Sequence, residues 1–181
     1  MKIILQTTAI ILFNLLTFNV SAQLKESELS DVFQTYGFVK GQEYSLDRIE
    51  ANHPEYTIDI TKCKAEFNSK FKSSVNNLEA ELISLIVDEF FDEYKITLNK
   101  ELDKLLAQQE LSSEEMKLFF TEVTNRSKGN LQSPVLEYLL YYKFKEKPHQ
   151  EFLQDYIQEF LTKDHSKSKG TDVKLKIPLS W

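Results

Sequence analysis

The stretch that decides the fold is residues 56–86, which read YTIDITKCKAEFNSKFKSSVNNLEAELISLI. Its apolar side chains recur at steps of three or four residues, which is the period of one helix face. The recurring positions are Tyr56, Ile60, Cys63, Phe67, Phe71, Val75, Leu78, Leu82 and Ile86. This period predicts a long helix whose apolar stripe lies in the core. Such a helix would be roughly 45 Å long, so we expect a bend near Ser73-Ser74 or Asn76-Asn77.

Before this stretch, the sequence predicts two shorter helices separated by a turn. The first runs from about Glu26 to Tyr36 and ends at Gly37, because glycine readily adopts the left-handed conformation that closes a helix. A turn follows through Gly41. Ser45 then caps a short helix that ends before Pro54, since the residue before a proline is pushed out of helical geometry.

After this stretch, helical patterns continue. Residues Leu82–Phe91 are apolar on most sides, which is typical of the centre of a core. We expect a break around Tyr94–Thr97, followed by a helix up to residue 106. Ser112 and Glu115 form a capping box, in which each side chain binds the backbone N–H of the other residue. This motif predicts a helix that ends at Gly129.

Two prolines open the last predicted helices. Ser133-Pro134 begins a helix that continues to about Lys145, with serine as the cap and proline in the first turn. Pro148 begins the next helix, which carries an amphipathic stripe. The stripe consists of Phe152, Leu153, Tyr156, Ile157, Phe160 and Leu161.

The end of the chain has a different pattern. Residues 164–171 are polar, and Val173, Leu175, Ile177 and Leu179 then alternate with polar residues before Trp181. Alternation of this kind predicts a strand. A lone strand has no partner, so this one docks on the helices, pairs with another chain or stays flexible.

The beginning of the chain predicts export. Residues 1–22 contain Lys2, an apolar run and the small residues Val20 and Ala22, which fit the narrow subsites of signal peptidase. Polar residues interrupt the run, so it is too short to span about 30 Å of hydrocarbon. We therefore expect cleavage near Ala22 and no membrane span afterwards. This segment resembles the signal peptides of bacterial exported proteins, which implies a periplasmic or secreted location.

These patterns predict an all-α protein, an irregular bundle of about six or seven helices with a short extended C-terminal tail. The expected organisation is a signal peptide over residues 1–22, a helical domain over 23–163, and a polar linker with a strand-like tail over 164–181. Sparse punctuation supports long helices, because the chain has only four glycines and four prolines. Cys63 cannot form an internal disulfide, and its place on an apolar stripe predicts a buried thiol rather than a reactive or intermolecularly paired one.

No residue pattern predicts a catalytic, cofactor-binding or metal site. His53, His149 and His165 are far apart in sequence and match no zinc motif. Glycine-rich phosphate loops and nucleophile elbows are missing as well. The carboxylates Asp88, Glu89, Asp92 and Glu93 lie at helical spacing and could bind a cation or act as acid and base, although such clusters are usually a solvated helix face.

Aromatic residues crowd the last two predicted helices. They are Tyr138, Tyr141, Tyr142, Phe144, Phe152, Tyr156 and Phe160. These side chains could line a groove for a peptide or an apolar ligand, but aromatic stripes at helical spacing are mostly interior. We therefore favour core packing over a groove.

The function that the sequence favours is protein interaction. The net charge of −6 disfavours binding to nucleic acid. An acidic helical surface with a strand-forming tail could meet a basic partner or add a strand to one, as an inhibitor, immunity or accessory protein would. The alternatives are a protein that binds an apolar ligand and an enzyme whose carboxylates converge only in the folded state.

Overall fold

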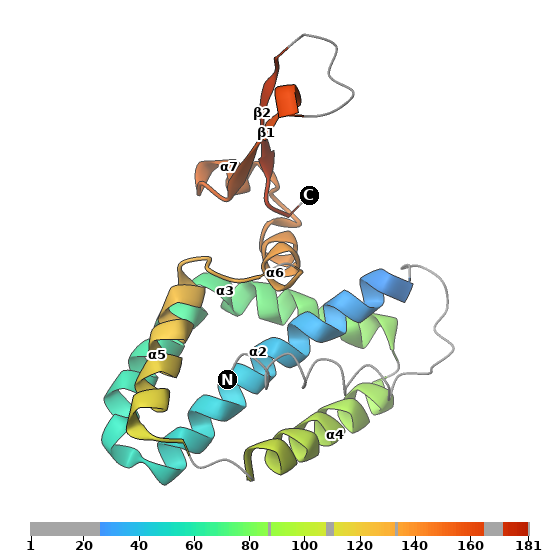
Figure 1. Ribbon diagram of the computed structural model, residues 1–181. Helices are drawn as coiled ribbons and strands as arrows, with labels where there is room; N and C mark the ends of the chain where they lie inside the picture. Colours follow the sequence, from blue (N-terminus) through green and yellow to red (C-terminus); the bar gives the residue numbers. More distant parts are fainter. Residues whose placement is uncertain (1–25, 87, 108–110, 133, 165–171, 181) are drawn as a thin grey trace.

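The computed structural model describes residues 26–86, 88–107, 111–132, 134–164 and 172–180 (Figure 1). Within these residues the chain folds into six α-helices and one two-stranded sheet, so the predicted all-α irregular bundle is confirmed. The helices are α2 (Glu26–Asn52), α3 (Thr57–Leu85), α4 (Asp88–Ala107), α5 (Ser113–Ser127), α6 (Val135–Phe144) and α7 (His149–Leu153). Strands β1 (Ile157–Leu161) and β2 (Lys174–Pro178) and the 3-10 turns η1 (Pro54–Tyr56) and η2 (Thr162–Asp164) complete it. The predicted signal peptide lies outside the described residues.

Helix α2 is one continuous helix, so the turn predicted at Gly37 and Gly41 is wrong. Each glycine costs a helix roughly 1 kcal/mol relative to alanine, which local burial can offset. The buried face of α2 supplies this burial on both sides of the two glycines. It consists of Val32, Phe33, Tyr36, Val39, Leu46 and Ile49. Ser45, predicted as a cap, lies inside the helix and its hydroxyl donates to the carbonyl of Gly41 at 2.7 Å.

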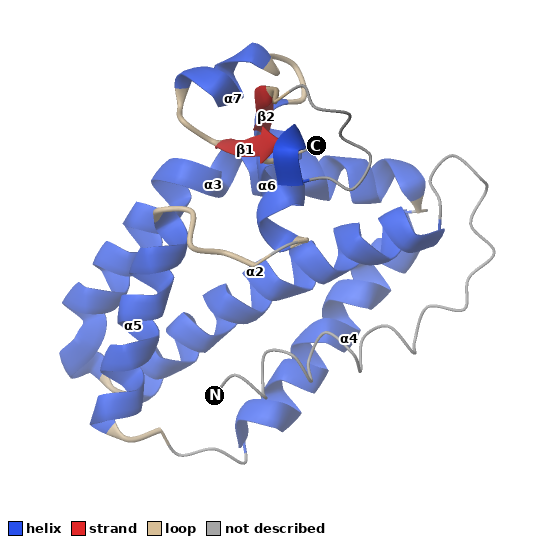
Figure 2. Cartoon of the chain, turned by 45° about the horizontal axis from the view of Figure 1, so that its top comes forward, coloured by secondary structure: helices blue, strands red, loops and turns tan. Residues whose placement is uncertain are grey.

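Helix α3 agrees closely with the long helix predicted from residues 56–86. Seven of its predicted stripe residues are buried, from Ile60 to Leu82. The helix ends at Leu85 because Ile86 takes an extended conformation, with φ −125° and ψ 149°. The break predicted around Tyr94–Thr97 is therefore wrong, since α4 runs without interruption through those residues. Figures 1 and 2 show that α3 changes direction along its length.

The core consists of two apolar clusters. Helices α2, α3 and α6 contribute to both of them, whereas α5 contributes only to the first and α4 only to the second. The first contains Phe67, Phe71 and Phe120, and the second contains Tyr36, Leu82 and Phe91.

Within the described part of the chain, every helix is too short or too polar to cross a lipid bilayer.

The capping box at Ser112 is confirmed. The Ser112 hydroxyl accepts from the N–H of Glu115 at 3.3 Å, and the Glu115 carboxylate accepts from the N–H of Ser112 at 2.9 Å. Helix α5 then ends before Gly129, whose φ of +93° is the left-handed conformation expected for that position. Helix α6 starts at Val135, as predicted, but Pro134 is its N-cap residue rather than a residue of its first turn, and Ser133, predicted as the cap, lies outside the described residues.

The helix predicted from Pro148 to Leu161 is wrong beyond Leu153. Asp155 has a φ of +58°, which ends the helical path, and β1 follows. The apolar residues of 157–161 fit the period of a helix and that of a strand equally well, so the sequence pattern of this segment does not decide between the two. The strand-like pattern of residues 173–179 is confirmed as β2, and its partner is β1 within the same chain.

Candidate functional site

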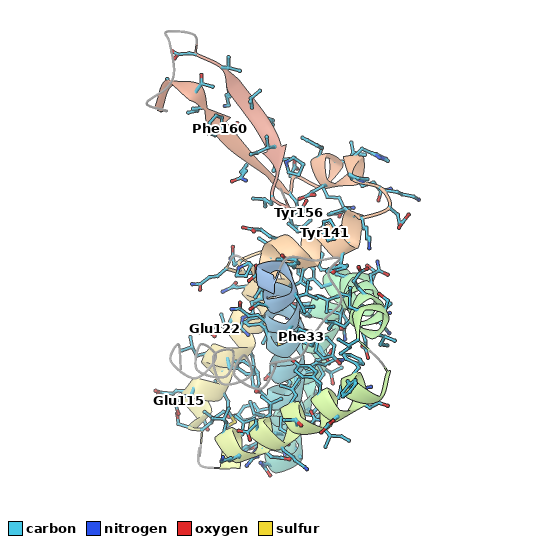
Figure 3. The ribbon with its side chains drawn as sticks, turned by 90° about the vertical axis from the view of Figure 1, so that its right-hand side faces the viewer. Phe33, Glu115, Glu122, Tyr141, Tyr156 and Phe160 are labelled. Atoms are coloured by element: carbon cyan, nitrogen blue, oxygen red, sulfur yellow. The ribbon has the colours of Figure 1, made fainter. Side chains whose placement is uncertain are left out.

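The C-terminal arm, which we define as β1 and β2, extends beyond helices α2 to α6, and α7 lies beside its base (Figures 1 and 3). The strands are antiparallel, with Phe160 opposite Leu175 and Glu159 opposite Lys176. Because successive side chains of a strand point to opposite sides, the arm has two different faces. Figure 3 shows Phe160 on the arm, further from the helices than Tyr156 at its base.

One side of the arm is apolar. This apolar face contains Phe160, Val173, Leu175 and Ile177, and it also carries Gln158 opposite Ile177. Val173 is 40% exposed, Phe160 41% and Leu175 46%. Neighbouring exposed apolar side chains on a protruding element are unusual in a protein that acts alone, and they commonly mark a contact surface.

The other side of the arm is charged. This charged face carries Glu159, Lys174 and Lys176, and it also carries Ile157, Leu161 and Pro178. The Nζ atom of Lys174 lies 2.7 Å from Oε2 of Glu159, and within the described residues Lys176 makes no ion pair. The sequence around the arm is also basic, with five lysines and two aspartates between residues 162 and 176. The two strands themselves carry two lysines and one glutamate, a net charge of +1, whereas the chain as a whole has a net charge of −6.

A buried carboxylate fixes the base of the arm. Glu151 of α7 is 1% exposed, and its two oxygens accept hydrogen bonds from the backbone N–H and the hydroxyl of Ser180, at 2.9 and 2.6 Å. The N–H of Leu179 donates to the carbonyl of Tyr156 at 3.1 Å, which continues the pairing of the strands. Hydrogen bonds to a buried charged group are among the stronger ones, so this contact holds the end of β2 firmly against α7.

Aromatic packing connects the base of the arm to the helices. The rings of Tyr156 and Phe144 lie 6.1 Å apart. The Lys143 ammonium lies 5.8, 5.3 and 5.5 Å from the ring centroids of Phe71, Phe144 and Tyr156, respectively. Burial, together with the nearby charge of Lys70, lowers the pKa of Lys143. The arm is thus attached to the first core cluster through Phe71 and Phe144.

The aromatic residues predicted as a core or a groove are divided between interior and surface. Tyr142 and Phe144 are buried in the two clusters, which confirms core packing for them. Tyr138 and Tyr156 are half-buried. Tyr141, Phe152 and Phe160 are exposed, and Phe160 belongs to β1 rather than to a helix.

The predicted acidic cluster lies on α4. Asp92 is exposed and its Oδ1 is 2.7 Å from Nζ of Lys95, and Glu93 is exposed as well. The side chains of Asp88 and Glu89 lie outside the described part of the structure. In the described residues, no group of three or more histidine, cysteine, aspartate or glutamate side chains is arranged to hold a metal ion.

Cys63 is buried, as predicted. Its Sγ atom lies 3.4 Å from the carbonyl oxygen of Phe120 and 3.7 Å from the hydroxyl of Thr124. Burial raises the pKa of the thiol, so the reactive thiolate is disfavoured.

Among the histidines, His53 contacts Glu55 at 3.3 Å and His149 is exposed, while His165 lies outside the described residues.

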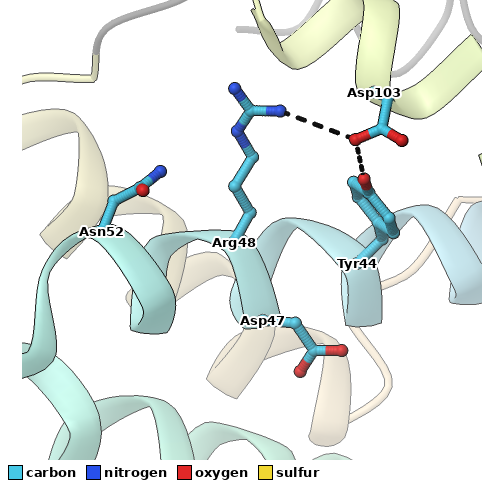
Figure 4. A pocket seen from close by; sticks show the side chains of 5 residues that line it. All are labelled: Tyr44, Asp47, Arg48, Asn52 and Asp103. Carbon is cyan, nitrogen blue, oxygen red and sulfur yellow. Dashed lines mark hydrogen bonds and ion pairs between the residues drawn. The ribbon is translucent and has the colours of Figure 1, made fainter.

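An open polar depression lies between α2 and α4 (Figure 4). It is lined by Tyr44, Asp47, Arg48, Asn52 and Asp103. The hydroxyl of Tyr44 donates to Asp103, which raises the pKa of Tyr44, and Arg48 lies 4.0 Å from the same carboxylate. The charged groups that line the depression already bind one another or Lys64, so they serve to join helices rather than to hold a substrate.

Sequence reasoning missed the roles of Glu151 and Lys143. Each belongs to a segment rich in charged residues, and no spacing distinguishes a buried charge from a solvated one before the tertiary contacts are known. Comparison with known proteins gives no further indication of functional residues. No protein-family model matches this chain, and no curated protein or solved structure is significantly similar to it.

Proposed function

We propose that this chain is an exported interaction protein that binds a partner protein through the apolar face of the C-terminal arm. The observation that carries the proposal is the exposure of Val173 and Leu175 on an element that extends beyond helices α2 to α6. Apolar side chains on such an element gain free energy when a partner removes them from water, at about 25 cal/mol per Å². Export is supported by the sequence of residues 1–22.

The way the arm is attached also supports a binding role. A surface that is already held in its binding conformation loses less entropy when it binds. The contact between Glu151 and Ser180 and the packing of Tyr156 on Phe144 hold the base of the arm in place.

The two alternative functions have less support. A protein that binds an apolar ligand needs a cavity among its aromatic side chains, but Tyr142 and Phe144 fill the two core clusters. An enzyme that uses carboxylates needs them in a cleft, but Asp92 lies on an exposed helix surface and pairs with Lys95.

Site-specific photo-crosslinking in the native host tests the proposal. A photoreactive amino acid replaces Leu175 in the full chain, and the matched control replaces Leu118, which is 54% exposed on α5. We expect one discrete crosslinked protein from position 175 and none from position 118. If positions 173 and 175 both give no crosslinked protein, or the same products as position 118, the proposal is wrong.

A further inference from the structure

The pairing of the strands shows which backbone groups of β2 are open to a partner. The N–H of Thr162 donates to the carbonyl of Val173 at 3.0 Å, and the N–H of Leu179 donates to that of Tyr156. In an antiparallel pair, residues alternate between bonding their partner strand and pointing outward. Leu175 and Ile177 therefore bond β1, whereas the N–H and C=O groups of Lys174 and Lys176 point to the opposite edge.

That edge of β2 can accept another strand. Within the described residues, the sheet has two strands, and nothing pairs with the outer side of β2. A two-stranded sheet is marginally stable in water, and a third strand stabilises it. Addition of an extended segment to an open edge is a common mode of recognition between proteins, in which the backbone provides affinity and the side chains provide specificity.

The side chains of β2 define what such a strand must contain. Lysines at 174 and 176 alternate with Leu175 and Ile177. Strand β1 meets this pattern in part from the inner side. Glu159 lies on the face of the lysines and Phe160 lies opposite Leu175, whereas Leu161 lies opposite Lys174 and Gln158 lies opposite Ile177. A strand on the outer edge would meet the same pattern, so it would be stabilised by acidic residues on one face and apolar residues on the other.

The lysines of β2 disfavour a basic strand at its outer edge. A second copy of β2 would place its lysines beside Lys174 and Lys176, and like charges in neighbouring strands are destabilising. The acidic helices do not prevent an acidic segment from reaching the arm, because the arm extends beyond helices α2 to α6 and charges are screened beyond about 8 to 10 Å at physiological ionic strength.

From these observations we infer that the partner supplies an extended segment, in which acidic and apolar residues alternate, and that this segment adds to the outer edge of β2 as a third strand. The inference rests on the proposed function and identifies the chemical class of its partner. The net charge of the whole chain predicts a basic partner, whereas this inference predicts an acidic one. The reason is that the segment contacts the arm and therefore meets the charge of the arm.

Hydrogen exchange on the full-length protein, measured by NMR with a synthetic peptide, tests the inference. The peptide alternates glutamate with valine and phenylalanine, and the controls are the same composition in scrambled order and a version with lysine in place of glutamate. We expect the amides of Lys174 and Lys176 to become protected only with the alternating acidic peptide. The amides of Leu175 and Ile177 already bond β1, so they serve as internal references.

Charge reversal provides the second measurement. The double variant Lys174→Glu, Lys176→Glu should bind the acidic peptide about tenfold more weakly and should bind the lysine peptide instead. The control is Lys117→Glu, Lys128→Glu on and beside α5, which changes the net charge equally but leaves the arm intact. Circular dichroism of both variants verifies that the helices are folded.

The outcomes distinguish this inference from the proposed function. If Leu175 is crosslinked to a partner but no peptide protects Lys174 and Lys176, the segment inference is wrong and the interaction proposal stands. If the lysine or scrambled peptide gives the same protection, recognition by charge and alternation is wrong. If the control variant loses as much affinity as the arm variant, net charge alone accounts for binding and the inference is overturned.

Discussion

Arg126 joins α5 to α2 through contacts that are largely buried. Its Nη1 donates to Oε1 of Gln42 at 2.8 Å, and its Nη2 lies 3.2 Å from the Glu122 carboxylate. The guanidinium also lies 5.0 Å from the ring centroid of Phe38. Burial lowers the pKa of Arg126 and the charge of Glu122 opposes this shift. The arginine thus supplies a hydrogen-bond donor to the buried amide oxygen of Gln42.

Replacing Arg126 with alanine should destabilise the protein by about 2 kcal/mol, because Gln42 is left buried without its donor. Urea denaturation measures the loss. The matched control is Arg48→Ala, which removes a partly exposed ion pair of 4.0 Å and should cost about 0 to 1 kcal/mol. Equal losses in the two variants would contradict a special role for Arg126.

At the level of single elements, Gly41 offers a direct test of the continuous helix α2. A methyl group added at this position would lie 3.6 Å from Cδ2 of Leu102, which is an ordinary contact. Gly41→Ala should therefore raise the free energy of unfolding by about 0.5 to 1 kcal/mol. Gly129→Ala should lower it instead, because Gly129 has a φ of +93°. If Gly41→Ala is destabilising, a turn at that position is the better description.

The capping box predicts a dependence on pH. Hydrogen bonds from the N–H and then the hydroxyl of Ser112 lower the pKa of Glu115 in the folded state. A carboxylate with a lowered pKa stabilises the fold above its unfolded pKa, and the contribution is lost as the pH falls through the folded pKa. The stability difference between the natural protein and Glu115→Gln should therefore be present at pH 7 and shrink at acidic pH. The control Glu114→Gln, outside the box, should show less of this change.

The helices could be predicted from the sequence wherever one apolar stripe was long enough to outweigh local signals. The stripe of α3 and the capping box of α5 meet this condition. The glycines of α2 and residues 157–161 do not meet it, because their conformation depends on tertiary contacts. Burial of one face of α2 keeps its glycines helical, and pairing with β2 makes residues 157–161 a strand. The candidate site was only half predicted for the same reason. Alternation indicated β2, but nothing local indicated that β1 was its partner.

On the scale of the whole molecule, the arm should be dispensable for folding. Neither core cluster contains a buried residue of β1 or β2, although Tyr156 and Leu179 pack against the first one. A chain cut after Lys163, which keeps β1 but loses β2 and the Ser180 partner of Glu151, should therefore keep its helical circular dichroism while its melting temperature falls. Phe71→Ala serves as the contrast and should cost about 3 to 5 kcal/mol, because Phe71 is 0% exposed. A truncated chain that fails to fold would show that the arm is part of the core.

The sharing of α2, α3 and α6 between the two clusters has a consequence for cooperativity. Neither cluster can melt as an independent unit, because losing one would remove part of the buried contacts of the same three helices. Scanning calorimetry should accordingly record one transition whose calorimetric and van't Hoff enthalpies agree. Helices α4 and α5, which each contact a single cluster, are then the parts able to detach in partial openings while the three shared helices remain assembled.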